Sequence, residues 1–233
     1  MPYVSDQLPA VDSDRPVILF DLDGTVLDSA PGIIAAQQQA IRDVGLEPPD
    51  ESVLRSDLGP PPAVLFTRIG VPERLITAAV DAYRVHYLDR GIQNAAIFPG
   101  VADLLTRLRP QYRLATATMK LISTAIPFLQ HHGIADQFEV VGGAADGVHE
   151  KSAIIAATRA ALGDPPPEKM IMVGDRHSDI SGGRDQGLRT IAVTWGYGTR
   201  QELQDSNPDL IIDHPDQLPE AADLLLAAPA TGT

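Results

Sequence analysis

Two aspartates separated by one residue follow the first apolar run of the chain, in the segment DLDGT at residues 21–25. The run at residues 17–20 is continuously apolar, which is typical of a strand buried on both faces, and parallel sheets bind ligands at the carboxyl ends of their strands. Two carboxylates buried there are costly unless one holds a proton or a cation lies between them. The segment therefore predicts a cation or acid–base site, with a polar turn at Gly24 as the plainer alternative.

An EF-hand does not explain these aspartates. Counted from Asp21, that calcium loop needs Gly at position 6 and Glu at position 12, where this chain has Val26 and Gly32.

The DLDGT segment resembles the first motif, DxDGT, of the haloacid dehalogenase superfamily of phosphohydrolases. Its second motif, a Ser or Thr that ends the next strand, matches Thr118 in LATATMK, with Thr116 as the alternative. The third, a Lys that opens a later helix, matches Lys151 in HEKSAII, and the fourth, GDxxxD, matches residues 174–179. The resemblance spans about residues 17–198 with the four motifs in order, which is far more specific than DxDGT alone.

Each matched residue also has a plainer interpretation. Thr118 could be an ordinary β-branched strand residue, Asp175 part of a turn, and Asp179 an acid favoured by a helix N-terminus. Lys151 could be a solvated helix residue, but the chain has only three lysines against fifteen arginines, so lysine is not its default surface cation. A compact ammonium suits the neutralisation of a carboxylate and a phosphoryl oxygen together.

The resemblance implies a phosphoryl-transfer mechanism. Asp21 would attack phosphorus and form an aspartyl phosphate, while Asp23 would protonate the leaving oxygen and then activate water. Thr118 and Lys151 would bind the phosphoryl group. Dehalogenases of the same superfamily lack the second aspartate, so the presence of Asp23 favours hydrolysis of a phosphate ester.

The resemblance also implies Mg²⁺ as the cofactor. Its ligands would be a carboxylate oxygen of Asp21, the backbone carbonyl of Asp23 and the carboxylate of Asp175. Asp179 would orient water molecules on the metal without binding it directly.

The elements that must position these residues alternate between strands and helices. Apolar runs predict further strands over residues 112–117, 138–141, 170–173 and 190–194, with another at 209–213, and amphipathic spacing predicts helices between them. This alternation predicts an α/β fold, a doubly wound parallel sheet that forms a Rossmann-like core. Residues 31–98 interrupt it with helix patterns separated by prolines and show no strand pattern. We therefore expect a catalytic core at 15–30 and 99–228, an inserted helical cap at 31–98, and tails at 1–14 and 229–233.

In relatives of this kind the cap closes over the site and presents the pocket for the leaving group. Residues 59–62 (GPPP), the GDRxxD form of the fourth motif, and residues 195–198 (WGYG) resemble phosphoglycolate-phosphatase-like members. These features mark the subgroup and leave the substrate open among phosphoglycolate, nucleoside monophosphates, pyrophosphate and a specialised phosphorylated metabolite. Basic side chains that could contact it are Arg68, Arg84, His86 and Arg90, each of which is also typical of a solvated helix surface.

The composition indicates which classes of partner and which cellular compartment to expect. The formal net charge is −13 and the basic residues form no run, which disfavours nucleic acids and anionic membranes. The chain has no cysteine, no apolar stretch long enough to span a membrane and no signal-like start, so we expect a cytoplasmic monomer or homodimer.

Three other functions remain. A phosphosugar mutase would share every catalytic residue. A receiver-like signalling module would also use an aspartate at a strand end, Mg²⁺, Thr and Lys, but it would need neither the helical insertion nor Asp23. A catalytically silent binding protein would be expected to have lost a motif residue.

Overall fold

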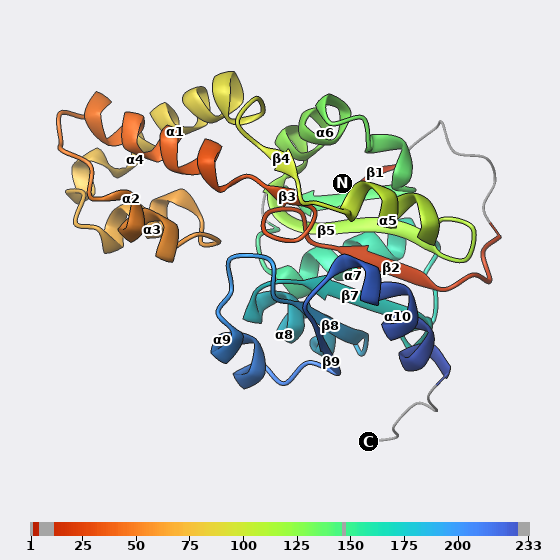
Figure 1. The fold of residues 1–233 in the computed structure, drawn as a ribbon. Coiled ribbons are helices and arrows are strands. Elements are labelled where there is room, and N and C mark those ends of the chain that lie inside the picture. Colours follow the sequence, from red (N-terminus) through yellow and green to blue (C-terminus); the bar gives the residue numbers. More distant parts are fainter. Residues whose placement is uncertain (1, 5–11, 146–147, 228–233) are drawn as a thin grey trace. The chain divides into compact units, whose positions relative to one another are not determined.

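A computed structural model describes residues 2–4, 12–145 and 148–227, and the chain divides into two compact units (Figure 1). The first unit combines Met1–Leu27 with Ile97–Thr233, and the second is Asp28–Ala96.

The first unit is built on one sheet with the strand order β1-β6-β5-β2-β7-β8-β9. Its central strand, β2 (Val17–Phe20), pairs in parallel with β5 (Arg113–Leu121) on one side and β7 (Met170–Gly174) on the other. The parallel arrangement continues outward through β6 (Val140–Ala144), β8 (Arg189–Val193) and β9 (Leu210–Ile212). The predicted doubly wound parallel sheet is therefore confirmed.

One edge strand corrects the prediction of an N-terminal tail. Tyr3–Val4 form β1 and pair antiparallel with β6, so the tail predicted over residues 1–14 is wrong for these two residues. An edge strand presents unpaired backbone groups that even a two-residue extended segment can satisfy, but so short a segment has no periodicity to detect. The tail predicted at 229–233 lies outside the described residues.

Helices flank this sheet (Figure 1). α7 packs against β5 and β6, α8 packs against β7 and β8, and these two helices contact each other. Ile154, Ile155 and Leu162 lie on the buried side of the α7 region and join a core with Val17, Leu19 and Met172. The helices of this unit are α5 (Val101–Leu108), α6 (Ile122–His131), α7 (Lys151–Ala161), α8 (His177–Asp185), α9 (Arg200–Asp205) and α10 (Leu218–Ala227), with short 3₁₀ turns at Ala135–Gln137, Pro167–Lys169 and Pro215–Gln217.

The second unit is helical, and prolines mark where several of its helices begin. Pro62 is the first residue of α3 and Pro72 precedes α4, since a proline at a helix start loses no backbone hydrogen bond. Within this unit Tyr83 stacks on Tyr87 at 5.4 Å between ring centroids. The helices are α1 (Ala30–Asp43), α2 (Glu51–Ser56), α3 (Pro62–Arg68), α4 (Glu73–His86) and a π-helix, η1 (Tyr87–Gly91).

Two short strands link the units. β3 (Leu27–Asp28) and β4 (Ala96–Ile97) are hydrogen-bonded neighbours in a separate two-stranded sheet. β4 falls within residues 31–98, where the sequence showed no strand pattern, because two residues are too few for such a pattern to be recognised. In the part of the chain that the structure describes, no helix combines the length and apolar character needed to span a membrane.

Candidate active site

The ends of the parallel strands bring three aspartates together. Asp21 follows β2, and its backbone N–H donates to the carbonyl of Val173 at 2.9 Å, which extends the β2–β7 pairing to the site. Asp175 follows β7, and Asp179 lies in the first turn of α8. One carboxylate oxygen from each of these aspartates lies within 4.8 Å of the other two, and all three residues are buried. This cluster could hold a metal ion.

Lys151, the first residue of α7, lies inside the cluster. Its Nζ is 2.9 Å from Asp21 Oδ1 and 2.7 Å from Asp179 Oδ1, and it donates to the carbonyl of Ala117 at 2.9 Å. Only 4% of its side chain is exposed. Lys151 is therefore a buried counterion and not a solvated helix residue.

Asp179 serves both the helix and the cluster. Its Oδ2 accepts the backbone N–H of Arg176 at 3.0 Å and so caps the start of α8, while its Oδ1 pairs with Lys151. The helix-capping acid suggested by the sequence and a charge in the site are thus the same carboxylate.

The buried charges shift one another's pKa. Burial raises the pKa of Asp21 to about 6, an effect that Lys151 opposes and that Asp179 and Asp23 strengthen. Burial by itself lowers the pKa of Lys151, but the attraction of Asp179 and Asp21 outweighs it, so that this pKa is raised. Lys151 therefore stays charged at neutral pH, whereas the carboxylates resist being ionised together.

Asp175 is the most completely enclosed of the aspartates. Burial raises its pKa to about 8, and the negative charges of Asp179 and Asp21 add to that shift. Two donors act in the opposite direction: the backbone N–H of Tyr197 lies 2.8 Å from Oδ2, and the hydroxyl of Thr25 lies 2.9 Å from Oδ1. A bound cation would supply the positive charge that the ionised carboxylates lack.

Loops from two parts of the chain fit closely around Asp175. Gly24 has a φ of +89°, and a Cβ there would lie 2.2 Å from Asp175 Oδ2, so only glycine permits this approach. The indole N–H of Trp195 donates to the carbonyl of Thr25 at 3.0 Å and ties the WGYG loop to the DLDGT loop.

The end of β5 carries the predicted phosphoryl-binding threonine and its alternative. Thr118 is buried on β5, directly after Ala117, and its Oγ1 accepts the backbone N–H of Lys120 at 3.2 Å. The alternative, Thr116, donates its hydroxyl to the carbonyl of Gly142 at 2.9 Å within the sheet. This bond commits Thr116 to strand pairing and leaves Thr118 as the better candidate for a phosphoryl contact.

Sequence reasoning missed two polar residues of the site. Lys120 Nζ lies 2.9 Å from Asp23 Oδ2, and Thr25 binds Asp175. The rarity of lysine that drew attention to Lys151 applies equally to Lys120, and Thr25 is the last residue of the DLDGT motif. The rarity of lysine and the position of Thr25 in the motif could therefore have indicated both residues from the sequence alone.

Residues 18–193 match the haloacid dehalogenase-like hydrolase family. The chain belongs to this family. Its membership confirms the predicted fold and the prediction that the chain is an enzyme of this superfamily, and the phosphatases among its relatives support a phosphoric monoester hydrolase.

Relatives of this haloacid dehalogenase-like hydrolase carry two kinds of name. The tyrosine-protein kinase PtkA of Mycobacterium tuberculosis is 37% identical over 88% of this chain and 72% of its own length. A phosphoglycolate phosphatase of Aliivibrio fischeri is 33% identical over 86% of this chain and 93% of its own. The solved structure of the haloacid dehalogenase-like protein SP0104 from Streptococcus pneumoniae superimposes with a TM-score of 0.85 at 31% identity, covering 90% of this chain and 99% of that one. The predicted likeness to phosphoglycolate phosphatases is confirmed.

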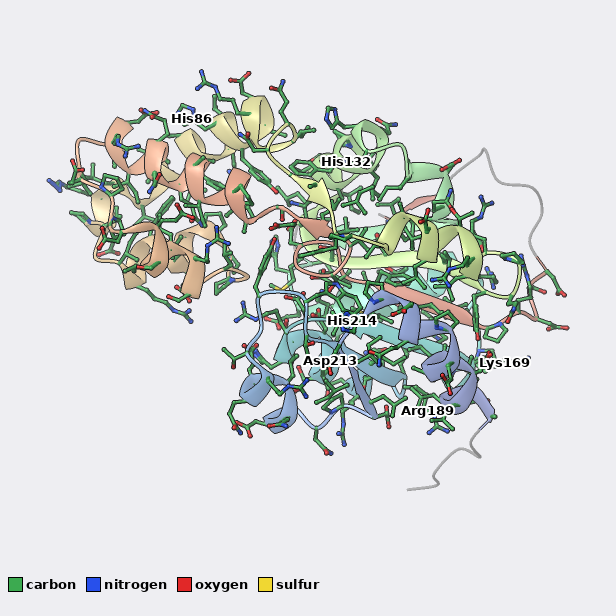
Figure 2. All side chains as sticks on the ribbon, in the orientation of Figure 1. His86, His132, Lys169, Arg189, Asp213 and His214 are labelled. Atoms are coloured by element: carbon green, nitrogen blue, oxygen red, sulfur yellow. The ribbon has the colours of Figure 1, made fainter. Side chains whose placement is uncertain are left out.

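The basic side chains considered in the helical unit are each close to a carboxylate of the same unit. His86, labelled in Figure 2, lies 2.6 Å from Asp43, and Arg68 lies 2.6 Å from Asp57. Arg84 and Arg90 pair with neighbouring aspartates on exposed helix surfaces. None of these four contacts by itself indicates a substrate pocket.

Proposed function

We propose that this haloacid dehalogenase-like hydrolase is a magnesium-dependent phosphatase that cleaves a small phosphate monoester through an aspartyl phosphate on Asp21. One observation carries the proposal: Asp21 is held by Lys151 at a strand end, in a buried cluster with Asp175 and Asp179. This arrangement offers a fixed nucleophile, a cation and ligands for a metal in one place.

The donor set suits Mg²⁺, a hard cation that prefers oxygen ligands. A carboxylate oxygen of Asp21, the backbone carbonyl of Asp23 and the carboxylate of Asp175 would hold it. The site holds four carboxylates, those of the buried three-aspartate cluster and of Asp23, and two ammonium groups, those of Lys120 and Lys151. With all of them ionised, the formal charge is −2, which a divalent cation balances. When bound, Mg²⁺ would supply positive charge to the phosphoryl oxygens as the reaction proceeds.

The chain's own residues would carry the bond changes. Because Lys151 engages Oδ1 of Asp21, Oδ2 is the oxygen we assign to attack phosphorus while the bond to the leaving oxygen breaks. Asp23 would give its proton to that oxygen. In the second half, Asp23 would take a proton from the water that displaces Asp21 from phosphorus and releases inorganic phosphate.

Thr118 and Lys151 would bind the phosphoryl group during both halves. Since Thr118 Oγ1 accepts the N–H of Lys120, the hydroxyl proton of Thr118 can be donated to a phosphoryl oxygen. Lys151 would neutralise a second oxygen. We assign Asp179 to orienting water near the metal and keeping Lys151 in place.

The phosphoglycolate phosphatases among the relatives make phosphoglycolate the first substrate to test. Nucleoside monophosphates, pyrophosphate and specialised phosphorylated metabolites follow it. We place the reaction in the cytoplasm.

The relative named a tyrosine-protein kinase supports a second candidate, transfer of the phosphoryl group to a tyrosine hydroxyl instead of water. The same nucleophile and acid–base residue would serve both reactions, because only the final acceptor differs.

The deciding experiment measures phosphate release over a panel of phosphorylated metabolites, with chelator and with added Mg²⁺. We expect release that needs Mg²⁺, disappears in Asp21→Asn and is accompanied in the unmodified enzyme by an acid-stable, hydroxylamine-sensitive phosphoprotein. Full turnover in chelator, or in Asp21→Asn, would refute the proposal. Parallel incubation with ATP and a tyrosine-containing peptide, analysed for phosphotyrosine, tests the second candidate.

A further inference from the structure

The end of β5 is irregular at the point where it reaches the site. Thr118 pairs with Gly143 and Leu121 pairs with Ala144, so β5 has two residues between these pairs, Met119 and Lys120, where β6 has none, and they form a bulge. A bulge changes the direction of side chains relative to a regular strand, and bulges are frequent beside active sites.

Gly143 makes room for this bulge. A Cβ at Gly143 would lie 2.7 Å from the carbonyl oxygen of Lys120 and 3.2 Å from Cγ1 of Ile122, both closer than ordinary packing allows. The local backbone is therefore shaped around the absence of a side chain at this position.

The bulge presents Lys120 to Asp23. Nζ of Lys120 lies 2.9 Å from Asp23 Oδ2 and 4.4 Å from the ring centroid of Phe128, which is fully buried in α6. Only 4% of the Lys120 side chain is exposed, against 24% for Asp23. The ammonium is thus fixed from two sides, by a carboxylate and by an aromatic face.

The backbone of the same residue reaches a second functional group. The N–H of Lys120 donates to Thr118 Oγ1, which sets the direction in which the threonine hydroxyl can donate. One bulged residue therefore contacts both the acid–base candidate and the phosphoryl-binding candidate.

We propose that Lys120 is a positioning residue that holds the carboxylate of Asp23 in the orientation needed for proton transfer. Because Lys120 engages Oδ2, we assign the transferred proton to Oδ1 of Asp23. An acid in the first half of the reaction that becomes a base in the second must remain beside the reacting oxygens throughout, and contact with the buried Lys120 ammonium limits the rotation of the partly exposed Asp23 side chain in both protonation states. This inference rests on the role given to Asp23 under the proposed function.

The test is a double-mutant cycle with Lys120→Met and Asp23→Asn, measured in single turnover on an alkyl phosphate and on an aryl phosphate with an acidic phenol. The aryl leaving group needs little protonation, so the loss on it should be small. We expect Lys120→Met to slow cleavage of the alkyl ester about 10- to 100-fold and of the aryl ester only a few-fold. In the Asp23→Asn background, Lys120→Met should change the rate less than about twofold, because a positioning residue has nothing left to position.

Lys169→Met is the matched control. Lys169 is an exposed lysine just before β7, at the opposite end of that strand from Asp175, and is labelled in Figure 2. This control should leave both ester rates unchanged. If Lys120→Met does not fold, Phe128→Leu provides the second variant: it removes the aromatic face, keeps an apolar side chain, and should shift the alkyl-to-aryl ratio in the same direction by a smaller factor.

Equal losses on the two esters, or effects of Lys120→Met and Asp23→Asn that multiply, would overturn the role of Lys120. Failure of the proposed function has a different signature. Asp23→Asn alone would then cleave the alkyl ester as fast as the unmodified enzyme, whatever the result for Lys120→Met.

Discussion

Asp175 combines complete burial with two hydrogen-bond donors, Thr25 and the backbone of Tyr197. The donors orient both carboxylate oxygens, but they do not replace the charge that a cation would provide. The metal-free protein therefore stores unfavourable electrostatic energy at this residue and at Asp21.

This charge predicts how stability changes with pH. The pKa of Asp21 rises from 3.8 to about 6 and that of Asp175 to about 8, so above pH 4 the folded state keeps protons that the unfolded chain releases. The stabilisation is fully present below the unfolded pKa and is lost as pH rises through the folded values. The melting temperature of metal-free protein should thus fall between pH 5 and pH 8.

Asp175→Asn isolates the contribution of this group to the pH dependence. Its amide can accept from the Tyr197 N–H and donate to Thr25 Oγ1, so the contacts are kept while the titration is lost. Calorimetry in chelator should show a smaller decline in melting temperature for this variant than for the unmodified protein. Equal declines would show that Asp175 does not titrate in this range.

The two threonines of β5 allow a matched comparison. Thr118→Val should lower kcat/KM about 10- to 100-fold, since it removes the hydrogen bond that we assign to a charged phosphoryl oxygen. Thr116→Val should instead cost about 1–3 kcal/mol of stability, because it removes a buried hydrogen bond to the Gly142 carbonyl, with activity nearly unchanged. Steady-state kinetics and urea unfolding of both variants test this, and the opposite pattern would make Thr116 the substrate-binding residue.

At the scale of elements, the bulge of β5 depends on Gly143. In Gly143→Ala the new methyl group meets the Lys120 carbonyl, a backbone atom that can move only by reshaping the bulge. We expect about 1–3 kcal/mol of destabilisation and a loss of activity that is greater on an alkyl ester than on an aryl ester. Gly133→Ala is the control, because Gly133 has a φ of +67° with open space around it, so the variant should lose stability without changing the ester ratio.

Two neighbouring glycines in β6 limited how well the bounds of the strands could be predicted from the sequence. β2 and β7 were predicted within one residue because each is a continuous apolar run. β6 was predicted over residues 138–141 but runs from Val140 to Ala144, since Gly142 and Gly143 do not resemble strand residues. Packing requires glycine at both positions. A Cβ at Gly143 would meet the Lys120 carbonyl, as described above, and a Cβ at Gly142 would lie 1.8 Å from Thr158 Oγ1.

The sequence also predicted one part of the candidate site and missed another. Motif order could assign Asp21, Asp175 and Lys151 to strand ends and a helix start, because in a parallel sheet these positions share one edge. The pairing of Lys120 with Asp23 could not be predicted, since it depends on a bulge that regular alternation of side chains does not reveal.

At the scale of the whole molecule, the chain passes between its two units through neighbouring strands, β3 and β4. A segment whose ends are hydrogen-bonded neighbours can be removed with little strain on what remains. All six predicted site residues belong to the first unit.

We therefore predict that replacing residues 30–95 with a short Gly-Ser linker leaves a folded core that still binds Mn²⁺. If the helical unit selects the substrate, the shortened chain should lose much more kcat/KM on the natural ester than on an aryl phosphate. Titration calorimetry and paired kinetics check the two statements. Loss of Mn²⁺ binding would show that the core depends on the helical unit, and unchanged selectivity would remove that unit from substrate choice.

The placement of β2 has a consequence for biosynthesis. Val17 pairs with Arg113 and Met170, so the central strand leaves the ribosome long before either neighbour, with the whole helical unit synthesised in between. Four fully buried apolar residues thus remain without strand partners in the nascent chain, a state prone to aggregation. The helical unit, which is continuous in sequence, can fold during that interval, and the yield of active enzyme should depend on how quickly translation proceeds from β3 to β5.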